Sequence, residues 1–213
     1  QSPQTLGVTI KKTPAGNYHH CQICDLIFMD PQERLSPEKE RARYDLHDSQ
    51  DTEGYRKFLE PVILQIDQCF LTLACPKEEV AILDYGCGQT AFFSKMLAER
   101  GYTARNYDVF FHTNQSVLQK NYDVIVSTEV WEHFYHPLEE LEQLIKILKP
   151  HGLLAAMTSA HQGLNHFQSW YYRRDPTHVC FYSEITMKWI STFFKLKLIK
   201  ADSPYWTFQE NTP

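Results

Sequence analysis

Apolar side chains follow a helical spacing in the first third of the chain and gather into short runs in the rest. Between residues 55 and 73, Phe58, Val62 and Ile66 recur every four residues. This spacing places them on one face of an α-helix. Pro61 lies inside the pattern, and proline removes a backbone donor from a helix. The segment therefore predicts an amphipathic helix that is bent or restarted at Pro61.

Beyond residue 79, short apolar runs alternate with helical stretches. The runs predict strands over 80–83, 103–107, 124–126 and 153–157. The intervening and following stretches predict helices over 91–100, 137–148 and 184–193. Ser183 precedes the last of these helices, and serine is a favoured N-cap. Alternating strands and helices are typical of a parallel sheet covered on both faces.

The predicted fold class is therefore α/β, with a doubly wound, mostly parallel sheet of Rossmann-like type. Two further apolar runs, at 194–199 and 205–208, flank the turn Asp202-Ser203-Pro204 and predict a terminal antiparallel hairpin. The stretch at 109–122 is too short for a complete strand–helix unit. We therefore expect one crossover of the sheet to be degenerate.

Residues 1–54 differ in composition and patterning from the remainder. They contain several prolines, the closely spaced Cys21 and Cys24, and a charged run at 38–43. Proline-rich stretches are typical of loops. We therefore predict an N-terminal extension over 1–54, irregular with one short polar helix, and a main domain over 55–213.

The composition fits a folded protein that binds small partners. The 213 residues are 43% hydrophobic and 22% charged, which supplies enough apolar material for a core. The formal net charge of -5 provides no strong field for a phosphate backbone and argues against nucleic acid as a partner. No apolar run reaches the length of a membrane span. The predicted partner is therefore neither nucleic acid nor membrane.

The N-terminus and the cysteines indicate the compartment. Residues Gln1–Gly16 lack the basic and apolar regions of a signal peptide. Of the 6 cysteines, only Cys21 and Cys24 are closely spaced, a pattern more typical of reduced thiols than of a disulfide framework. We therefore predict a cytoplasmic protein.

A glycine turn at the end of the first strand of the main domain carries the sharpest chemical signal. Gly86 and Gly88 permit a tight turn before a helix, so that backbone N–H groups approach a ligand closely. The spacing Gly86-x-Gly88-x-x-Ala91 also fits a relaxed dinucleotide fingerprint. Asp84 separates the two interpretations, because a carboxylate there repels a pyrophosphate and attracts a cationic or amine-bearing ligand.

Further motifs follow this turn in chain order. They are Asp84-x-Gly86-x-Gly88, Asp108, Tyr122-Asp123, Glu129-Val130-Trp131-Glu132-His133 and Leu148-Lys149-Pro150-His151-Gly152. Together they resemble the class I S-adenosylmethionine-dependent methyltransferases over about residues 55–210. The resemblance is closest to the broad group that includes quinone and small-molecule methyltransferases. Two features depart from that pattern: Gln89-Thr90 replaces a third glycine, and the segment of the usual third strand is shortened.

The resemblance implies a methyltransferase variant of the Rossmann-like fold, with S-adenosylmethionine as cofactor and a small-molecule methyl acceptor. Asp84, Gly86 and Gly88 would line the methionine end of the cofactor. Asp108 would accept hydrogen bonds from the ribose hydroxyls, and Glu129 would face the cofactor. Asp84 and Asp108 also suit the simpler role of strand-end turn residues.

His133 and His178 are the candidate catalytic residues. The pKa of an ordinary histidine is near neutrality, so a neutral imidazole can accept a proton from an acceptor hydroxyl as the methyl group transfers. The alternative is that both are ordinary polar or capping histidines. The sequence does not distinguish O, N or C as the methylated atom.

A metal site is a second interpretation of the same region. Four residues fall at i, i+3, i+4 and i+7, and so share one face if the stretch is helical: Glu129, Glu132, His133 and His136. With His178 this resembles the magnesium-dependent small-RNA 2′-O-methyltransferases. Pro137 begins the next helix, however, and Glu-His is common in methyltransferases that lack a metal. We therefore expect no metal there.

His19-His20-Cys21-x-x-Cys24 resembles half of a zinc knuckle. A closed zinc site needs four ligands, and the sequence contains no second Cys-x-x-Cys. Zinc binding and plain packing both remain open for Cys21 and Cys24.

Two other functions compete with methyl transfer. An NAD-dependent dehydrogenase would use the glycine turn, but Asp84 is misplaced for it and few residues remain for a substrate domain. A non-catalytic binding protein on the same fold would bind neither cofactor. Titration with S-adenosylmethionine and NAD separates the three.

Overall fold

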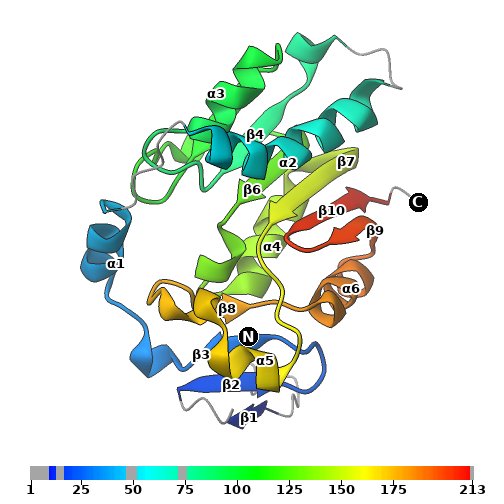
Figure 1. Cartoon of the computed structure of the whole chain (residues 1–213). Helices are drawn as coiled ribbons and strands as arrows, with labels where there is room; N and C mark the ends of the chain where they lie inside the picture. The colour runs from blue at the N-terminus through cyan, green and yellow to red at the C-terminus, as the bar shows by residue number, and fades with distance from the viewer. Residues whose placement is uncertain (1–9, 13–16, 47–51, 72–75, 212–213) are drawn as a thin grey trace.

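The computed structural model describes residues 10–12, 17–46, 52–71 and 76–211. Its main body is a six-stranded sheet in the order β5-β4-β6-β7-β10-β9 (Figure 1). The strands are β4 (Ile82–Tyr85), β5 (Ala104–Tyr107), β6 (Tyr122–Thr128), β7 (Leu148–Met157), β9 (Leu196–Asp202) and β10 (Tyr205–Glu210). Strands β5, β4, β6 and β7 are parallel, whereas β10 runs antiparallel to both β7 and β9. The mostly parallel sheet and the terminal antiparallel hairpin are thus confirmed.

Helices cover both faces of this sheet (Figure 1). They are α2 (Glu53–Leu71), α3 (Phe92–Glu99), α4 (Pro137–Lys146) and α6 (Glu184–Phe193). Successive strand residues point to opposite faces: Ile82 packs in one hydrophobic cluster with residues of α2 and α3, and Leu83 packs in another with residues of α4 and α6. The predicted doubly wound arrangement follows from this alternation.

The helices match their predicted positions within a few residues, with two differences. Helix α2 continues through Pro61 as one element, so no restart occurs there. Its buried face is formed by Leu59, Val62, Ile63 and Ile66. Phe58, which the periodicity places on the apolar face, is 38% exposed instead.

The second difference concerns the start of β7. Helix α4 ends at Lys146, and Leu148 pairs with Tyr122 as the first residue of the strand. Leu148 was predicted to be helical because its apolar side chain continues the helical period. The segment at 109–121 contributes a 3-10 turn at Gln115–Gln119 and no strand, so β5 is an edge strand and the degenerate crossover is confirmed.

The N-terminal part contains more structure than predicted. Strands β1 (Ile10–Lys12), β2 (Tyr18–Cys21), β3 (Ile27–Met29) and β8 (Cys180–Phe181) form a second, antiparallel sheet. The register of β3 with β8 pairs Ile27 with Phe181. Ile27 and Met29 belong to the same hydrophobic cluster as Phe181. The boundary between 1–54 and 55–213 remains a prediction, although residues from both parts share this cluster.

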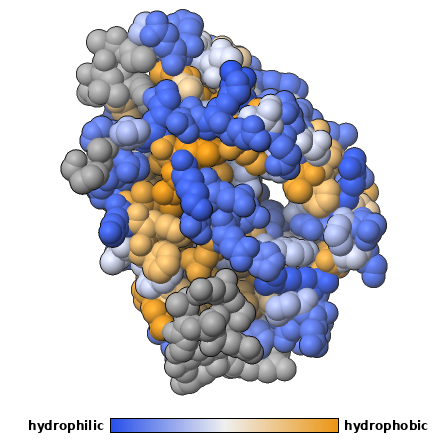
Figure 2. All heavy atoms as spheres, turned by 180° about the vertical axis from the view of Figure 1, so that it is seen from behind, coloured by the Kyte–Doolittle hydropathy of each residue, from blue (hydrophilic) through white to orange (hydrophobic). Residues whose placement is uncertain are grey.

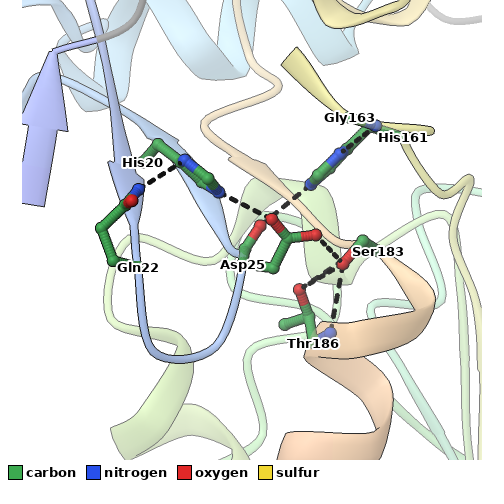
Figure 3. Close-up of polar contacts among 7 residues, drawn as sticks. All are labelled: His20, Gln22, Asp25, His161, Gly163, Ser183 and Thr186. Atoms are coloured by element: carbon green, nitrogen blue, oxygen red, sulfur yellow. Dashed lines mark hydrogen bonds and ion pairs between the residues drawn. The ribbon is translucent and has the colours of Figure 1, made fainter.

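A polar cluster centred on Asp25 joins the turn between β2 and β3 to the start of α6 (Figure 3). The Asp25 carboxylate contacts His20 Nε2 at 2.7 Å and accepts from Ser183 Oγ at 2.6 Å. The Asp25 carbonyl lies 3.0 Å from His161 Nε2. Ser183 also caps α6 as predicted, because its Oγ accepts from the backbone N–H of Thr186. One carboxylate therefore ties the turn between β2 and β3 to the N-terminus of α6.

The surface mixes hydrophilic and apolar side chains, with hydrophilic ones more extensive in the view from behind (Figure 2). Large apolar side chains that are more than half exposed include Leu64, Ile185 and Phe193. Among the described helices, none has the length and apolar character needed to cross a membrane.

Candidate active site

The residues predicted to bind a cofactor lie in or directly after the ends of three neighbouring parallel strands, β4, β5 and β6. Parallel strands end at one edge of a sheet, where ligands of open α/β sheets bind. The structure joins two of these strand ends directly. Gly86 donates its N–H to the Tyr107 carbonyl at 2.8 Å, and Gly88 donates to the Asp108 carboxylate at 3.0 Å. The glycine turn and Asp108 therefore form one unit.

The two glycines serve different purposes. Gly86 has a φ of +77°, and a Cβ there would lie 2.4 Å from Val130 Cγ2. Gly88 has a φ of +65°, and a Cβ there would meet no atom within 4 Å. Gly86 is therefore required by protein packing, whereas Gly88 borders open space. The cofactor-binding role of both glycines remains a prediction, and the open side of the turn lies at Gly88.

Asp84 is completely buried beneath this turn. Its Oδ2 accepts from Ser94 Oγ at 2.8 Å, but its Oδ1 has no partner among the described residues. Burial raises the pKa of Asp84 to about 6 despite the Ser94 hydrogen bonds. A buried carboxylate oxygen without a partner is costly, so it is suited to a ligand that brings a donor or a positive charge.

Asp108 is engaged by the backbone around it. Its Oδ1 accepts from the N–H groups of Phe110 and Phe111 at 2.8 and 3.0 Å, and its Oδ2 accepts from Gly88. The structural role of a turn residue is thus present. A carboxylate has about four lone-pair sites, so this geometry leaves room for a further donor, and the ribose contact remains a prediction.

Glu129 follows β6 in a left-handed backbone conformation, with a φ of +55°. Such a conformation is uncommon outside glycine and is concentrated at functional sites. Its Oε2 lies 3.3 Å from the hydroxyl of Tyr172, and its buried Oε1 has no described partner. Burial, reinforced by the nearby Glu132 charge, raises the pKa of Glu129 to about 9. The cofactor role of Glu129 remains a prediction, because its one described hydrogen-bond partner is Tyr172 and not a residue of the glycine turn.

Glu132, His133 and His178 come together beside Glu129. One potential ligand atom from each of the three lies within 4.8 Å of the others. Glu132 is fully buried, and its Oε1 accepts from Tyr172 at 2.6 Å. The two imidazole rings have centroids 4.9 Å apart. The structure therefore unites both predicted catalytic histidines with a carboxylate.

Backbone carbonyls fix the orientation of both rings. His133 Nδ1 lies 2.9 Å from the Thr177 carbonyl, and His178 Nδ1 lies 2.7 Å from the Tyr172 carbonyl. Because a carbonyl only accepts, each Nδ1 carries the proton and each Nε2 carries the lone pair in the neutral ring. Burial lowers the pKa of His178, which favours this neutral form. Both imidazoles are thus prepared to accept a proton or to bind a metal through Nε2.

The helical face considered for Glu129 to His136 does not form. Trp131–His133 is a single 3-10 turn, and the chain is extended at Phe134. His136 is exposed at the N-terminus of α4 and is not part of the three-residue cluster. Helix α4 begins only at Pro137, so no continuous helix carries residues 129–136 on one face.

Three tyrosines from separate segments lie at the site. Tyr172 contacts both Glu129 and Glu132. Burial raises the pKa of Tyr55, and the charges of Glu129 and Asp84 raise it further, which places Tyr55 near both carboxylates. Tyr44 ends α1 (Pro37–Tyr44) with its ring 5.3 Å from that of His133. The sequence gives no signal for a role of Tyr44 or Tyr55 at the site, since aromatic side chains are equally typical of a core.

Cys21 and Cys24 lie close to one another, but their surroundings do not complete a metal site in the described part of the chain. Burial raises the pKa of Cys24 to about 12. His19 pairs with Asp30 and His20 with Asp25. Zinc binding by the two cysteines therefore remains a prediction.

Solved structures share this fold at low sequence identity. One is the Burkholderia thailandensis 1,6-didemethyltoxoflavin-N1-methyltransferase with bound 1,6-didemethyltoxoflavin and S-adenosylhomocysteine, which is 12% identical to this chain. The match covers 92% of this chain and 100% of that one, with a TM-score of 0.56. The plantazolicin methyltransferase BpumL, with a monoazolic desmethylPZN analog and SAH, is 18% identical over 86% of this chain and 91% of that one, with a TM-score of 0.50. No curated protein sequence matches the chain.

A family model gives the assignment at the sequence level. The model described as a methyltransferase domain matches residues 55–200, which is more than half of the chain. This span contains the glycine turn, Asp108 and the histidine pair. The resemblance drawn from the motifs is confirmed, and the chain belongs to the methyltransferase-domain family.

Proposed function

We propose that the protein transfers a methyl group from S-adenosylmethionine to a small-molecule acceptor. One observation supports this most directly: the unpartnered Oδ1 of the buried Asp84 beneath the glycine turn. The cofactor carries an amino group and a cationic sulfonium, which are the chemical features that such an oxygen attracts. A dinucleotide pyrophosphate would be repelled there.

The protein's own residues would then align the donor and the acceptor. The sulfonium is already an activated methyl donor, so an in-line displacement needs positioning and exclusion of water more than covalent catalysis. Gly88 offers the open side of the turn for the cofactor, and Asp108 offers a remaining acceptor site for ribose hydroxyls. Both assignments rest on the geometry of the turn.

His133 and His178 would serve the methyl acceptor and not the cofactor. Their partners belong to the segment 172–178, whereas the glycine turn is tied to Asp108. An oxygen or nitrogen acceptor must lose a proton on methylation, and the neutral Nε2 of either ring is able to assist. Small molecules bound to the fold relatives named above, together with the formal net charge of -5, support an acceptor of this class.

Calorimetric titration of the full chain with S-adenosylhomocysteine and with NAD tests the proposal. We expect saturable binding of S-adenosylhomocysteine and none of NAD. Asp84→Asn keeps the shape of the side chain but removes its charge, and should weaken binding by a factor on the order of 10. Lack of binding by the wild type, or equal affinity in the variant, would contradict the assignment. Binding without any turnover across an acceptor screen would favour a non-catalytic role.

A further inference from the structure

We propose that Arg43, in the N-terminal extension, is a positioning residue that acts through Asp175 to orient the imidazole of His133. The proposal rests on the proposed function in one respect, because the oriented ring is one that would serve the methyl acceptor. The path itself consists of contacts between protein groups and needs no ligand. It begins on α1 and runs through the loop before β8.

The first step of the path is an ion pair between α1 and that loop. Arg43 Nη2 lies 2.8 Å from Asp175 Oδ2, and the side chain of Asp175 is only 15% exposed. Burial alone would raise the pKa of Asp175, but hydrogen bonds from Thr177 and nearby positive charge, including that of Arg43, lower it to about 2. Asp175 is therefore ionised at neutral pH, and its contact with the guanidinium is a charge-assisted hydrogen bond.

The second step is a pair of hydrogen bonds within the loop. Asp175 Oδ1 accepts from the backbone N–H of Thr177 at 3.0 Å and from its hydroxyl at 2.6 Å. Thr177 is completely buried, so these bonds are not exchanged for water. One carboxylate oxygen of Asp175 thus holds Arg43, and the other holds the backbone of Thr177.

The third step reaches the imidazole. His133 Nδ1 lies 2.9 Å from the carbonyl of Thr177. Because a carbonyl only accepts, this contact selects the neutral tautomer with the proton on Nδ1 and fixes the direction of Nε2. The ring also packs edge-on against Tyr44, the last residue of α1, with planes at 82°. Helix α1 therefore contacts His133 directly and controls its hydrogen-bond partner through Arg43.

A second arginine of α1 shows that the helix spans both sides of the site. Arg41 donates to the Phe110 carbonyl at 3.2 Å. Phe110 belongs to the turn whose N–H groups donate to Asp108, on the cofactor side. Arg43 lies on the hydrogen-bonded path to His133, whereas Arg41 contacts the other turn. The two arginines thus separate the positioning of His133 from the general docking of α1.

The path matters for methyl transfer because a general base must lie within hydrogen-bond reach of the proton that it accepts. A displacement of about 1 Å in a reacting group costs roughly 100-fold in rate. Without Arg43, the loop loses its contact with α1, and the Thr177 carbonyl is held less firmly. We therefore expect His133 to populate other orientations and the other tautomer.

Nitrogen-15 NMR of the histidine rings in the full chain tests this path without any acceptor. Protonated and unprotonated ring nitrogens have widely separated chemical shifts, and His133→Ala assigns the signals. At about pH 8, where an ordinary imidazole is neutral, wild-type His133 should have its proton on Nδ1. Arg43→Ala and Asp175→Ala should each lower the ratio of this tautomer to the other by a factor on the order of 10, equivalent to one net hydrogen bond. Arg43→Lys keeps the charge and should give an intermediate ratio.

Arg41→Ala is the matched control, because it removes the same kind of side chain from the same helix but from the other turn. It should leave the His133 signals unchanged; a change as large as in Arg43→Ala would mean that α1 acts only by general packing. An unchanged tautomer ratio in the folded Arg43→Ala and Asp175→Ala variants would likewise overturn the proposal. Thermal melting identifies loss of fold, and if Asp175→Ala unfolds, the more exposed Arg43 still gives the answer. S-adenosylhomocysteine titrated into the same samples tests the proposed function separately, since its failure to bind leaves the His133 result intact.

Discussion

At the scale of single residues, Asp84 links the cofactor site to pH. Burial raises the pKa of its carboxyl to about 6, and Ser94 only partly offsets this effect. A cationic ligand binds the ionised form. Below the folded-state pKa the ligand must therefore displace a proton, and affinity should fall by about tenfold per pH unit. Calorimetry with S-adenosylhomocysteine between pH 5 and 8 measures the slope, and Asp84→Asn should show none.

The same carboxyl should make the ligand-free protein less stable as the pH rises. Its pKa is higher in the folded state than its ordinary value of 3.8, so protonation favours the fold. This contribution is complete below 3.8 and is lost as the pH rises through about 6. At pH 8, Asp84→Asn should then raise the free energy of unfolding of the ligand-free protein, by up to roughly 3 kcal/mol. A destabilised variant would mean that Asp84 supports the fold instead.

The sequence predicts which residues gather at the site better than it predicts their roles. Spacing identifies Gly86 and Gly88, but only coordinates show that Val130 fills the space beside Gly86. Likewise, the three N–H groups that Asp108 accepts come from its own turn and from Gly88, contacts that depend on the backbone path. Side chains that reach the site from distant elements, such as Tyr44 beside His133, leave no local pattern.

At the scale of elements, the main sheet follows from the sequence because its apolar runs alternate with long helical stretches, and this alternation identifies even the four-residue strands β4 and β5. The antiparallel sheet of β1, β2, β3 and β8 does not, because its strands have only two to four residues. Such short strands carry too few alternating positions for a signal. Their pairing also joins residues about 150 positions apart, as Ile27 and Phe181 show.

Asp25 should hold this second sheet to α6. Its carboxylate accepts from Ser183 Oγ and contacts His20, and both contacts are partly buried. Asp25→Ala removes two charge-assisted hydrogen bonds, so the free energy of unfolding should fall by about 2–4 kcal/mol. Urea denaturation measures the loss. Asp30→Ala, which removes a more exposed carboxylate bonded to His19, should cost less than Asp25→Ala; equal costs would argue against a special role for Asp25.

At the scale of the whole molecule, the N-terminal part (1–54) and the main domain differ in sequence pattern, yet residues from both belong to one hydrophobic cluster. Tyr18, Ile27 and Met29 are each at most 7% exposed and pack with Phe167 and Phe181. Removing the N-terminal part would uncover these partners. Whether residue 54 is a domain boundary can therefore be tested by asking whether residues 55–213 fold on their own.

We expect the fragment 55–213 to be far less stable than the full chain. Losing the burial of Tyr18, Ile27 and Met29 alone costs about 4.5–9 kcal/mol, at roughly 1.5–3 kcal/mol per large apolar side chain. That is comparable with the whole stability of an ordinary domain. Urea denaturation should show a much lower midpoint for the fragment, whereas 17–213 should stay close to the full chain because it keeps β2 and β3. A fragment 55–213 that unfolds at the same urea concentration and binds S-adenosylhomocysteine equally well would establish it as an independent domain, with the N-terminal part as a dispensable cover.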